Sequence, residues 1–216
     1  MGLFGVNGNR KPEKRCAMKT RGFTLLELMI ILTIISTLTS LAIPNLIRAR
    51  MAANEVAAIA QMKALGTTQE IYRRTDWDGN GIKEYAQNIG NNGGNANLES
   101  LYFNIRNNSN TGLIDTSVCN AEIPNTGIIS GTTPRTGYLY YVQLGATYPA
   151  VVSFVNSNGV MNTGYSFCSI PYTYGLNGVN TFQMNSSGVV YARDQGTNLL
   201  VAAYNNNPTN GWYQNQ

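Results

Sequence analysis

One short segment carries oxygen-bearing side chains at alternating positions. Asp76, Asp78 and Asn80 are each two residues apart, and Gly81 follows them. Calcium takes about six to eight oxygen ligands from carboxylates, amides and backbone carbonyls, and a glycine permits the sharp turn around the ion. With the carbonyl of Ile82 and the carboxylate of Glu84, direct or through water, the segment predicts a Ca²⁺ site formed by Asp76, Asp78, Asn80, Ile82 and Glu84.

This spacing resembles the first half of an EF-hand loop. The bidentate glutamate expected at the twelfth position of such a loop is missing, since Gln87 stands there. The alternative interpretation is a Gly- and Asn-rich turn in which Asp76 and Asp78 are solvated. Calcium is the only cofactor that the sequence suggests.

The chain contains no histidine. Ser-His-Asp and Cys-His nucleophile systems are therefore excluded, as is His-ligated zinc, haem or copper. The phosphate loop and the dinucleotide fingerprint are both missing from the sequence, and the carboxylates outside residues 76–84 form no close pair. We expect a protein that is not an enzyme.

The basic character of the chain is concentrated at its N-terminus. The 216 residues carry a net charge of +4, but residues 1–22 hold six Lys or Arg and one acid, whereas residues 23–216 hold nine Lys or Arg and ten acids. Phosphate binding scales with the number of cations, so no nucleic-acid partner is expected for the head. A length of 216 residues allows one globular domain and one membrane segment.

Residues 23–43 form an apolar run with Glu27 as the single charge. A helix of about 20 residues crosses a bilayer core, and the basic flank places residues 1–22 in the cytoplasm. A cleaved secretory signal has a shorter apolar region, of ~7–15 residues, and a small-residue cleavage site. A plain anchor leaves Glu27 unexplained, because a carboxylate inside a membrane helix usually has a partner. An α-amino group created at Phe23 by cleavage after Gly22 would supply that partner.

The stretch Arg21-Gly22-Phe23-Thr24-Leu25-Leu26-Glu27-Leu28 resembles the processing site of type IV prepilins and of type II secretion pseudopilins. The resemblance implies that prepilin peptidase cuts between Gly22 and Phe23 and N-methylates Phe23. It also implies that Glu27 guides docking of subunits, and Pro44 falls where the family has its proline. The leader is longer than the shortest in the family, and Met18 is an alternative start.

The sequence after Pro44 favours continuation of the same helix. Proline is tolerated as a kink in membrane and packed helices, and residues 45–74 contain no further proline and only Gly66. Apolar residues recur at helical spacing, at positions 47, 51, 56, 59, 60, 62, 65 and 71. We expect an apolar transmembrane or filament-core segment at 23–44 and an amphipathic continuation at 45–74.

Residues 75–216 are rich in Gly, Asn, Ser, Thr and Tyr, which is typical of a β-rich head. Strands are predicted at 138–144, 150–155, 163–168, 180–184, 188–193 and 199–204, and a variable loop at 88–135. The fold class is therefore α+β, with a long N-terminal helix, apolar in its first half, packed on an antiparallel β-sheet in a pilin-like arrangement.

Two cysteines, Cys119 and Cys168, remain once the leader 1–22 with Cys16 is removed. An even number in an exported domain predicts a disulfide between them. The alternative is two buried thiols.

The resemblance implies a structural subunit of a type IV pilus-like filament that serves adhesion, motility or surface display. The chain would lie in the inner membrane before assembly, meet prepilin peptidase and an inner-membrane assembly platform, and end in a homo-oligomeric filament on the cell surface. Three alternatives stay open: a type II secretion pseudopilin that remains periplasmic, a DNA-capturing minor pilin, and an anchored binding protein that never polymerises.

Overall fold

The computed structural model describes residues 22–77, 79–90, 100–104, 109–123 and 132–215. The chain divides into two compact units, Met1–Ile43 and Pro44–Gln216. The leader residues 1–21, Asp78 and much of the predicted variable loop 88–135 lie outside the described residues.

Helix α1 spans Leu25–Arg73 and contains Pro44. Residues 45–73 hold one glycine and no other proline, so the backbone hydrogen bonds of the helix resume after Pro44. The predicted continuation of the helix past this proline is therefore confirmed. Its end is set by Thr75 and the Gly-rich turn after it, where the backbone N–H of Arg74 and of Thr75 donate to carbonyls three residues back.

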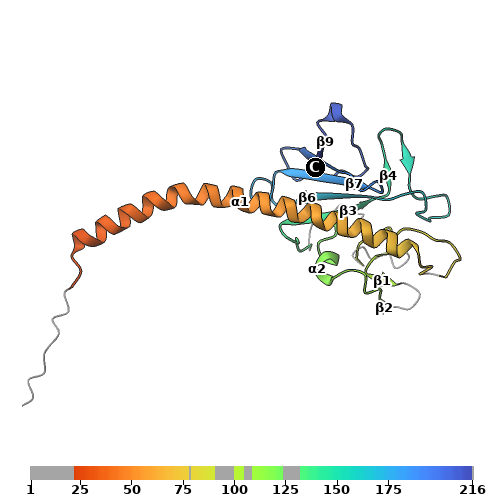
Figure 1. Ribbon diagram of the computed structural model, residues 1–216, viewed down its shortest axis with the longest axis horizontal. Coiled ribbons are helices and arrows are strands. Elements are labelled where there is room, and N and C mark those ends of the chain that lie inside the picture. The colour runs from red at the N-terminus through yellow and green to blue at the C-terminus, as the bar shows by residue number, and fades with distance from the viewer. Residues whose placement is uncertain (1–21, 78, 91–99, 105–108, 124–131, 216) are drawn as a thin grey trace, which may run out of the picture. The chain divides into compact units, whose positions relative to one another are not determined.

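The second unit is built on a five-stranded antiparallel sheet with the order β3-β6-β7-β8-β9 (Figure 1). Its strands are β3 (Tyr138–Gln143), β6 (Ser166–Pro171), β7 (Asn180–Asn185), β8 (Val190–Asp194) and β9 (Tyr213–Asn215). One row of paired residues crosses the whole sheet: Tyr141, Cys168, Gln183, Tyr191 and Gln214. The predicted antiparallel α+β head is confirmed.

The remaining elements are short. They are β1 (Phe103–Asn104) paired with β2 (Ser109–Asn110), the helix α2 (Thr116–Cys119), the hairpin of β4 (Gly145–Ala146) and β5 (Val152–Ser153), and the 3-10 turn η1 (Pro208–Asn210). Asp115 caps α2, since its side chain accepts from the N–H of Ser117.

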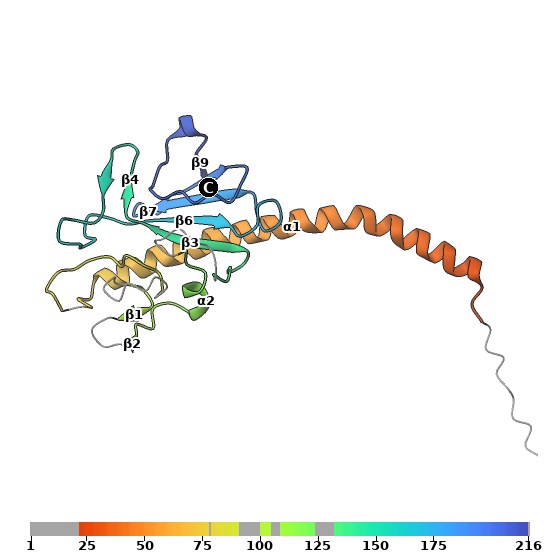
Figure 2. The same cartoon turned by 180° about the vertical axis from the view of Figure 1, so that it is seen from behind.

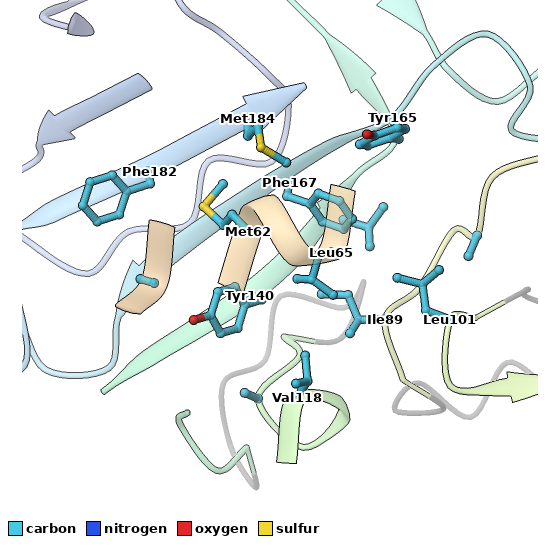
Figure 3. Close-up of a cluster of buried hydrophobic side chains, with 14 of the residues drawn as sticks. Met62, Leu65, Ile89, Leu101, Val118, Tyr140, Tyr165, Phe167, Phe182 and Met184 are labelled. Atoms are coloured by element: carbon cyan, nitrogen blue, oxygen red, sulfur yellow. The ribbon is translucent and has the colours of Figure 1, made fainter. Parts of the chain in front are cut away.

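The second half of α1 lies along one face of the sheet (Figures 1 and 2). Its buried stripe is Ala58, Met62, Leu65, Gln69 and Tyr72, spaced alternately by four and three residues. Figure 3 shows Met62 and Leu65 beside aromatic and Met side chains of the sheet and beside Ile89, Leu101 and Val118 from the connecting segments. This cluster is the main core.

The opposite face of the sheet is also covered. Leu139, Tyr141, Cys168 and Ile170 form a second cluster with Ile123, and Leu200 and Val201 pack against it. Every residue of β3 and β6 is buried, because α1 lies on one side and the C-terminal segment on the other. These strands therefore lack the alternation of a half-exposed strand.

Several sequence predictions of the fold need correction. The strand predicted at 163–168 lies at Ser166–Pro171, and that predicted at 150–155 is reduced to Val152–Ser153. Residues 199–204 form no regular strand and share only an isolated bridge between Tyr204 and Ala146, because they lie flat over the outer cluster. The strand β9 was not predicted, since Tyr213–Asn215 is short and polar. Val56 and Ile71 of the predicted apolar stripe are exposed, by 68% and 46%.

Candidate functional site

The first unit presents an apolar helix surface that no described residue covers. Phe23 and the large apolar residues from Leu25 to Ile43 are all at least 38% accessible to solvent, and Leu25 and Leu41 exceed 70%. By length and composition α1 contains one candidate membrane span near the N-terminus, none of which is buried. An aqueous solvent is therefore an unfavourable surrounding for this segment, at ~25 cal/mol per Å² of apolar surface.

The start of α1 is fixed by a local cap. The N–H of Glu27 donates to Oγ1 of Thr24 at 3.2 Å, and the N–H of Leu28 donates to the Thr24 carbonyl at 3.2 Å. Thr24 and Glu27 thus have the spacing of a capping box, with the acid in the first turn. This local role of Glu27 was not foreseen from the sequence, although Thr-x-x-Glu before an apolar run is its signal.

Gly22 and Phe23 precede the helix in exposed, irregular chain. Phe23 is 67% accessible. Both residues that flank the predicted cleavage bond are therefore exposed to solvent.

Hydroxyl groups on the apolar helix are satisfied within the helix itself. Thr33, Ser36, Thr37 and Thr39 each donate to a carbonyl three or four residues earlier, at 2.7–2.9 Å. Such bonds remove the cost of a polar group in an apolar medium. With Met29 and Leu32, three of these residues line a shallow hollow of about 390 Å³, where another helix can approach closely.

The predicted calcium segment forms a turn organised by Asp76. Its Oδ1 accepts from the N–H of Gly79 (2.7 Å) and of Asn80 (3.1 Å), and its Oδ2 accepts from the N–H of Gly81 (3.0 Å). Gly79 and Gly81 both have positive φ, 75° and 82°, which side chains rarely allow. The carboxylate therefore satisfies the hydrogen-bonding capacity of three backbone N–H groups of the turn.

The same turn gathers the other predicted ligands that the structure describes. Asn80 accepts from the N–H of Ile82 at 2.6 Å through Oδ1 and donates from Nδ2 to Oε1 of Glu84 at 3.0 Å. Among the described residues, which do not include Asp78, no group of three His, Cys, Asp or Glu could hold a metal ion. The calcium site stays a prediction, and the turn interpretation accounts for the contacts of Asp76.

The predicted disulfide is not formed in the structure. Cys119 ends α2, where its sulfur packs against the backbone of Gly90, whereas Cys168 lies in β6 on the outer face of the sheet. Both side chains are buried, and neither is part of a disulfide. Burial raises the pKa of the Cys168 thiol to about 12, so this thiol is a core residue with little thiolate.

Two buried or half-buried glutamates that the sequence did not single out hold loops in place. Oε1 of Glu55 on α1 accepts from the N–H of Val179 (2.8 Å) and of Asn180 (3.1 Å). Glu122, 3% exposed, accepts from the N–H of Ile89 (2.6 Å) and of Gly90 (2.7 Å). Burial raises the pKa of Glu122 to about 8, although both N–H groups act in the opposite direction. A single sequence gives no signal for such long-range contacts.

Comparison with known families gives two matches. The family described as "Protein of unknown function (DUF2950)" matches residues 39–214, and the prokaryotic N-terminal methylation motif matches residues 17–43. No solved structure matches the chain.

Curated relatives are similar over about a quarter of this chain. The type II secretion system core protein G of Escherichia coli (strain K12) is 39% identical over 59 residues, 27% of this chain and 41% of that protein. The type IV major pilin protein PilA of Myxococcus xanthus is 43% identical over 54 residues, 25% of this chain and 24% of that protein. The type IV wide pilus major component PilA4 of Thermus thermophilus is 42% identical over 53 residues, which are 24% of this chain and 40% of that protein. The matched segment thus spans less than half the length of each relative.

Proposed function

We infer a structural role from the premise that this chain belongs to the DUF2950 family and, through its N-terminal methylation motif, to the type IV pilin and type II secretion pseudopilin family. The chain is a pilin-like subunit, inserted in a membrane through α1 before assembly. We propose that it is cut between Gly22 and Phe23, methylated on the new N-terminus, and polymerised through the N-terminal helix into a type IV pilus-like filament.

The observation that carries this proposal is the exposed apolar surface of α1. About 20 residues of the helix have no partner within the described chain. A lipid bilayer satisfies such a surface before assembly, and copies of the same helix satisfy it afterwards. A subunit that leaves the membrane by polymerising never exposes this surface to water.

Glu27 and Pro44 support the same proposal. One carboxylate on an otherwise apolar helix needs a cationic partner in an apolar medium, and the amine of Phe23 in a neighbouring subunit is such a partner. Pro44 lies inside α1 at the boundary of the two compact units. Prepilin peptidase and an inner-membrane assembly platform are the partners that this route requires.

A second candidate function is that of a pseudopilin in a type II secretion system. The similarity to core protein G of Escherichia coli favours it, and so does the turn at 76–84 if it binds calcium. The similarity to two major pilins favours a surface filament that serves adhesion, motility or display. A DNA-capturing minor pilin is the weakest alternative, since residues 23–216 hold nine Lys or Arg and ten acids.

Shearing of intact cells separates these roles. For a surface pilus we expect the chain in the sheared extracellular fraction, shorter by the leader. For a pseudopilin we expect it to stay with the cells, and deletion of its gene to abolish export of folded proteins. A chain that stays in the membrane at full length, with export intact, would overturn both filament functions.

A further inference from the structure

Five described carboxylates of the head accept hydrogen bonds from uncharged donors. Glu55, Asp76 and Glu122 each accept from two or three N–H groups, and Glu70 Oε1 accepts from the hydroxyl of Tyr85 at 3.2 Å. Asp115 accepts from the N–H of Ser117. The head also carries cations, among them Arg73, Arg74 and Lys83.

Three of these cations surround one hollow at the end of α1. Arg73 and Arg74 come from the last turn and the residue after it, and Lys83 comes from the segment that follows the 76–81 turn. The hollow has a volume of about 200 Å³, and the carboxylate of Glu70 also lines it. Within the described part of the chain, Arg73, Arg74 and Lys83 make no ion pair. Positive charge therefore predominates in its lining.

Arg73 is held in place before any ligand arrives. Its guanidinium lies 5.0 Å from the centroid of the Tyr85 ring, and its Nη1 donates to the Tyr85 hydroxyl at 3.2 Å. Tyr85 is itself buried and stacks edge-on against Tyr165 at 4.9 Å. A guanidinium fixed in this way loses less freedom when its remaining N–H groups bind an oxyanion.

Two acids of the segment between Arg74 and Lys83 and directly after it are engaged in other hydrogen bonds. Asp76 accepts from three N–H groups of its own turn, and Glu84 is 5% exposed and bonded to Asn80. Favourable interaction with the helix dipole explains a basic residue in the last turn of a helix. It does not explain Lys83, which a different segment brings to the same hollow.

We propose that the hollow formed by Arg73, Arg74 and Lys83 binds a phosphate-type oxyanion. Arg73 and Arg74 supply fork-shaped donors, and Lys83 supplies a point charge. The oxyanion is either free phosphate or the phosphate monoester of a headgroup. All four residues that line the hollow belong to the second unit.

Titration of the full chain in non-ionic detergent micelles tests the proposal. The probes are inorganic phosphate and glycerol 1-phosphate at constant ionic strength, followed by NMR of the backbone amides. We expect saturable shifts centred on residues 73, 74 and 83. Tighter binding of glycerol 1-phosphate identifies a headgroup as the source, and tighter binding of inorganic phosphate identifies the free ion.

Paired substitutions with equal loss of charge provide the control. R74Q with K83Q should weaken phosphate binding by roughly tenfold or more, since bonds to charged groups are the stronger ones. R48Q with R50Q removes the same charge from exposed positions outside the hollow and should change the affinity by less than about twofold. Absence of saturable binding to the unaltered chain, or equal weakening in both variants, overturns the site.

Discussion

Glu27 occupies a position that local helix chemistry tolerates. It stands in the first turn of α1 after the Thr24 cap, where a negative charge is stabilised by roughly 0.3–1 kcal/mol. That gain is smaller than the few kcal/mol that an uncompensated carboxylate costs in a membrane helix. The remaining cost of the Glu27 carboxylate in the membrane would be offset by an amine of a neighbouring subunit.

Glu27→Gln therefore separates processing from assembly. We expect insertion and cleavage after Gly22 to continue, because the apolar run and the cleavage site are unchanged. The yield of sheared filament should fall by about tenfold or more, since ~1.4 kcal/mol of docking energy is a factor of ten. Thr24→Ala is the control, because it removes the cap and keeps the charge. Wild-type filament yield from Glu27→Gln would contradict the docking role.

Glu122 makes the stability of the head depend on pH. Burial raises the pKa of its carboxyl from 4.5 to about 8, so the folded state holds the proton more tightly than the unfolded state does. The contribution of Glu122 to the free energy of unfolding is complete below pH 4.5 and is lost as the pH rises through 8. Over this range the free energy of unfolding falls by up to about 1.4 kcal/mol per pH unit.

The Glu122→Gln variant should lack this slope, because an amide does not titrate in the range. We expect a constant loss of roughly 1–3 kcal/mol in its place, since the amide NH₂ leaves the N–H of Ile89 or Gly90 without an acceptor. Denaturant unfolding of the full chain in micelles from pH 4 to 9 measures both effects. Equal slopes in the two proteins would show that Glu122 is not the titrating group.

At the scale of elements, the loop from β6 to β7 is held against the sheet by a close approach at Gly178. A Cβ on Gly178 would lie 2.7 Å from Cζ of the buried Tyr138, whose ring cannot move aside because it packs on Phe182. Gly178→Ala should lower the free energy of unfolding by about 1–3 kcal/mol. Leu176→Ala in the same loop is 51% exposed and should change it by no more than about 0.5 kcal/mol. Comparable losses in the two variants would rule out the steric explanation.

The 76–84 turn gives a calcium test with a matched control. If the turn binds Ca²⁺, the ion should raise the melting temperature of the full chain in micelles, because a ligand that binds the folded state stabilises it. Asp76→Asn should abolish that rise. Asp115→Asn changes another carboxylate that accepts a backbone N–H, outside the turn, and should retain the rise. If Ca²⁺ does not change the melting temperature of the unaltered chain, the turn binds no calcium, and Asp76 serves only to accept the backbone hydrogen bonds of the turn.

The long helix and three of the strands could be predicted because each rests on local signals. Residues 45–73 lack helix-breaking residues apart from Gly66, and β3 is rich in aromatic and β-branched residues. Asn-Gly and Ser-Gly pairs mark the turns before β7 and β8. The buried stripe could not be read correctly because it includes Gln69, whose side chain pairs with the N–H and carbonyl of Ala86 at 2.9 and 2.8 Å. A pattern of apolar residues alone places such a glutamine at the surface.

The residues that we propose to be functional divide in the same way. Gly22, Phe23 and Glu27 belong to a contiguous motif that the sequence displays directly. The hollow of Arg73, Arg74 and Lys83, and the loop contacts of Glu55 and Glu122, depend on segments that only the fold brings together. The unformed disulfide has the same origin, because the count of cysteines does not reveal that Cys119 ends α2 whereas Cys168 lies on the outer face of the sheet.

At the scale of the whole molecule, the two units differ in whether their apolar side chains are buried. The first presents an apolar helix with no buried residue in its membrane-length window, and the second buries two clusters of its own around a sheet. A unit that satisfies its own core does not need the first for folding. The apolar helix is therefore available to lipid or to other copies of the chain.

Mass spectrometry of the N-terminal peptide from protein sheared off intact cells tests this account most directly. We expect a chain that begins at Phe23, carries a methyl group on its α-amine, and is recovered from the sheared material. An N-terminus that is still uncut, found only in the membrane fraction, would contradict both processing and polymerisation.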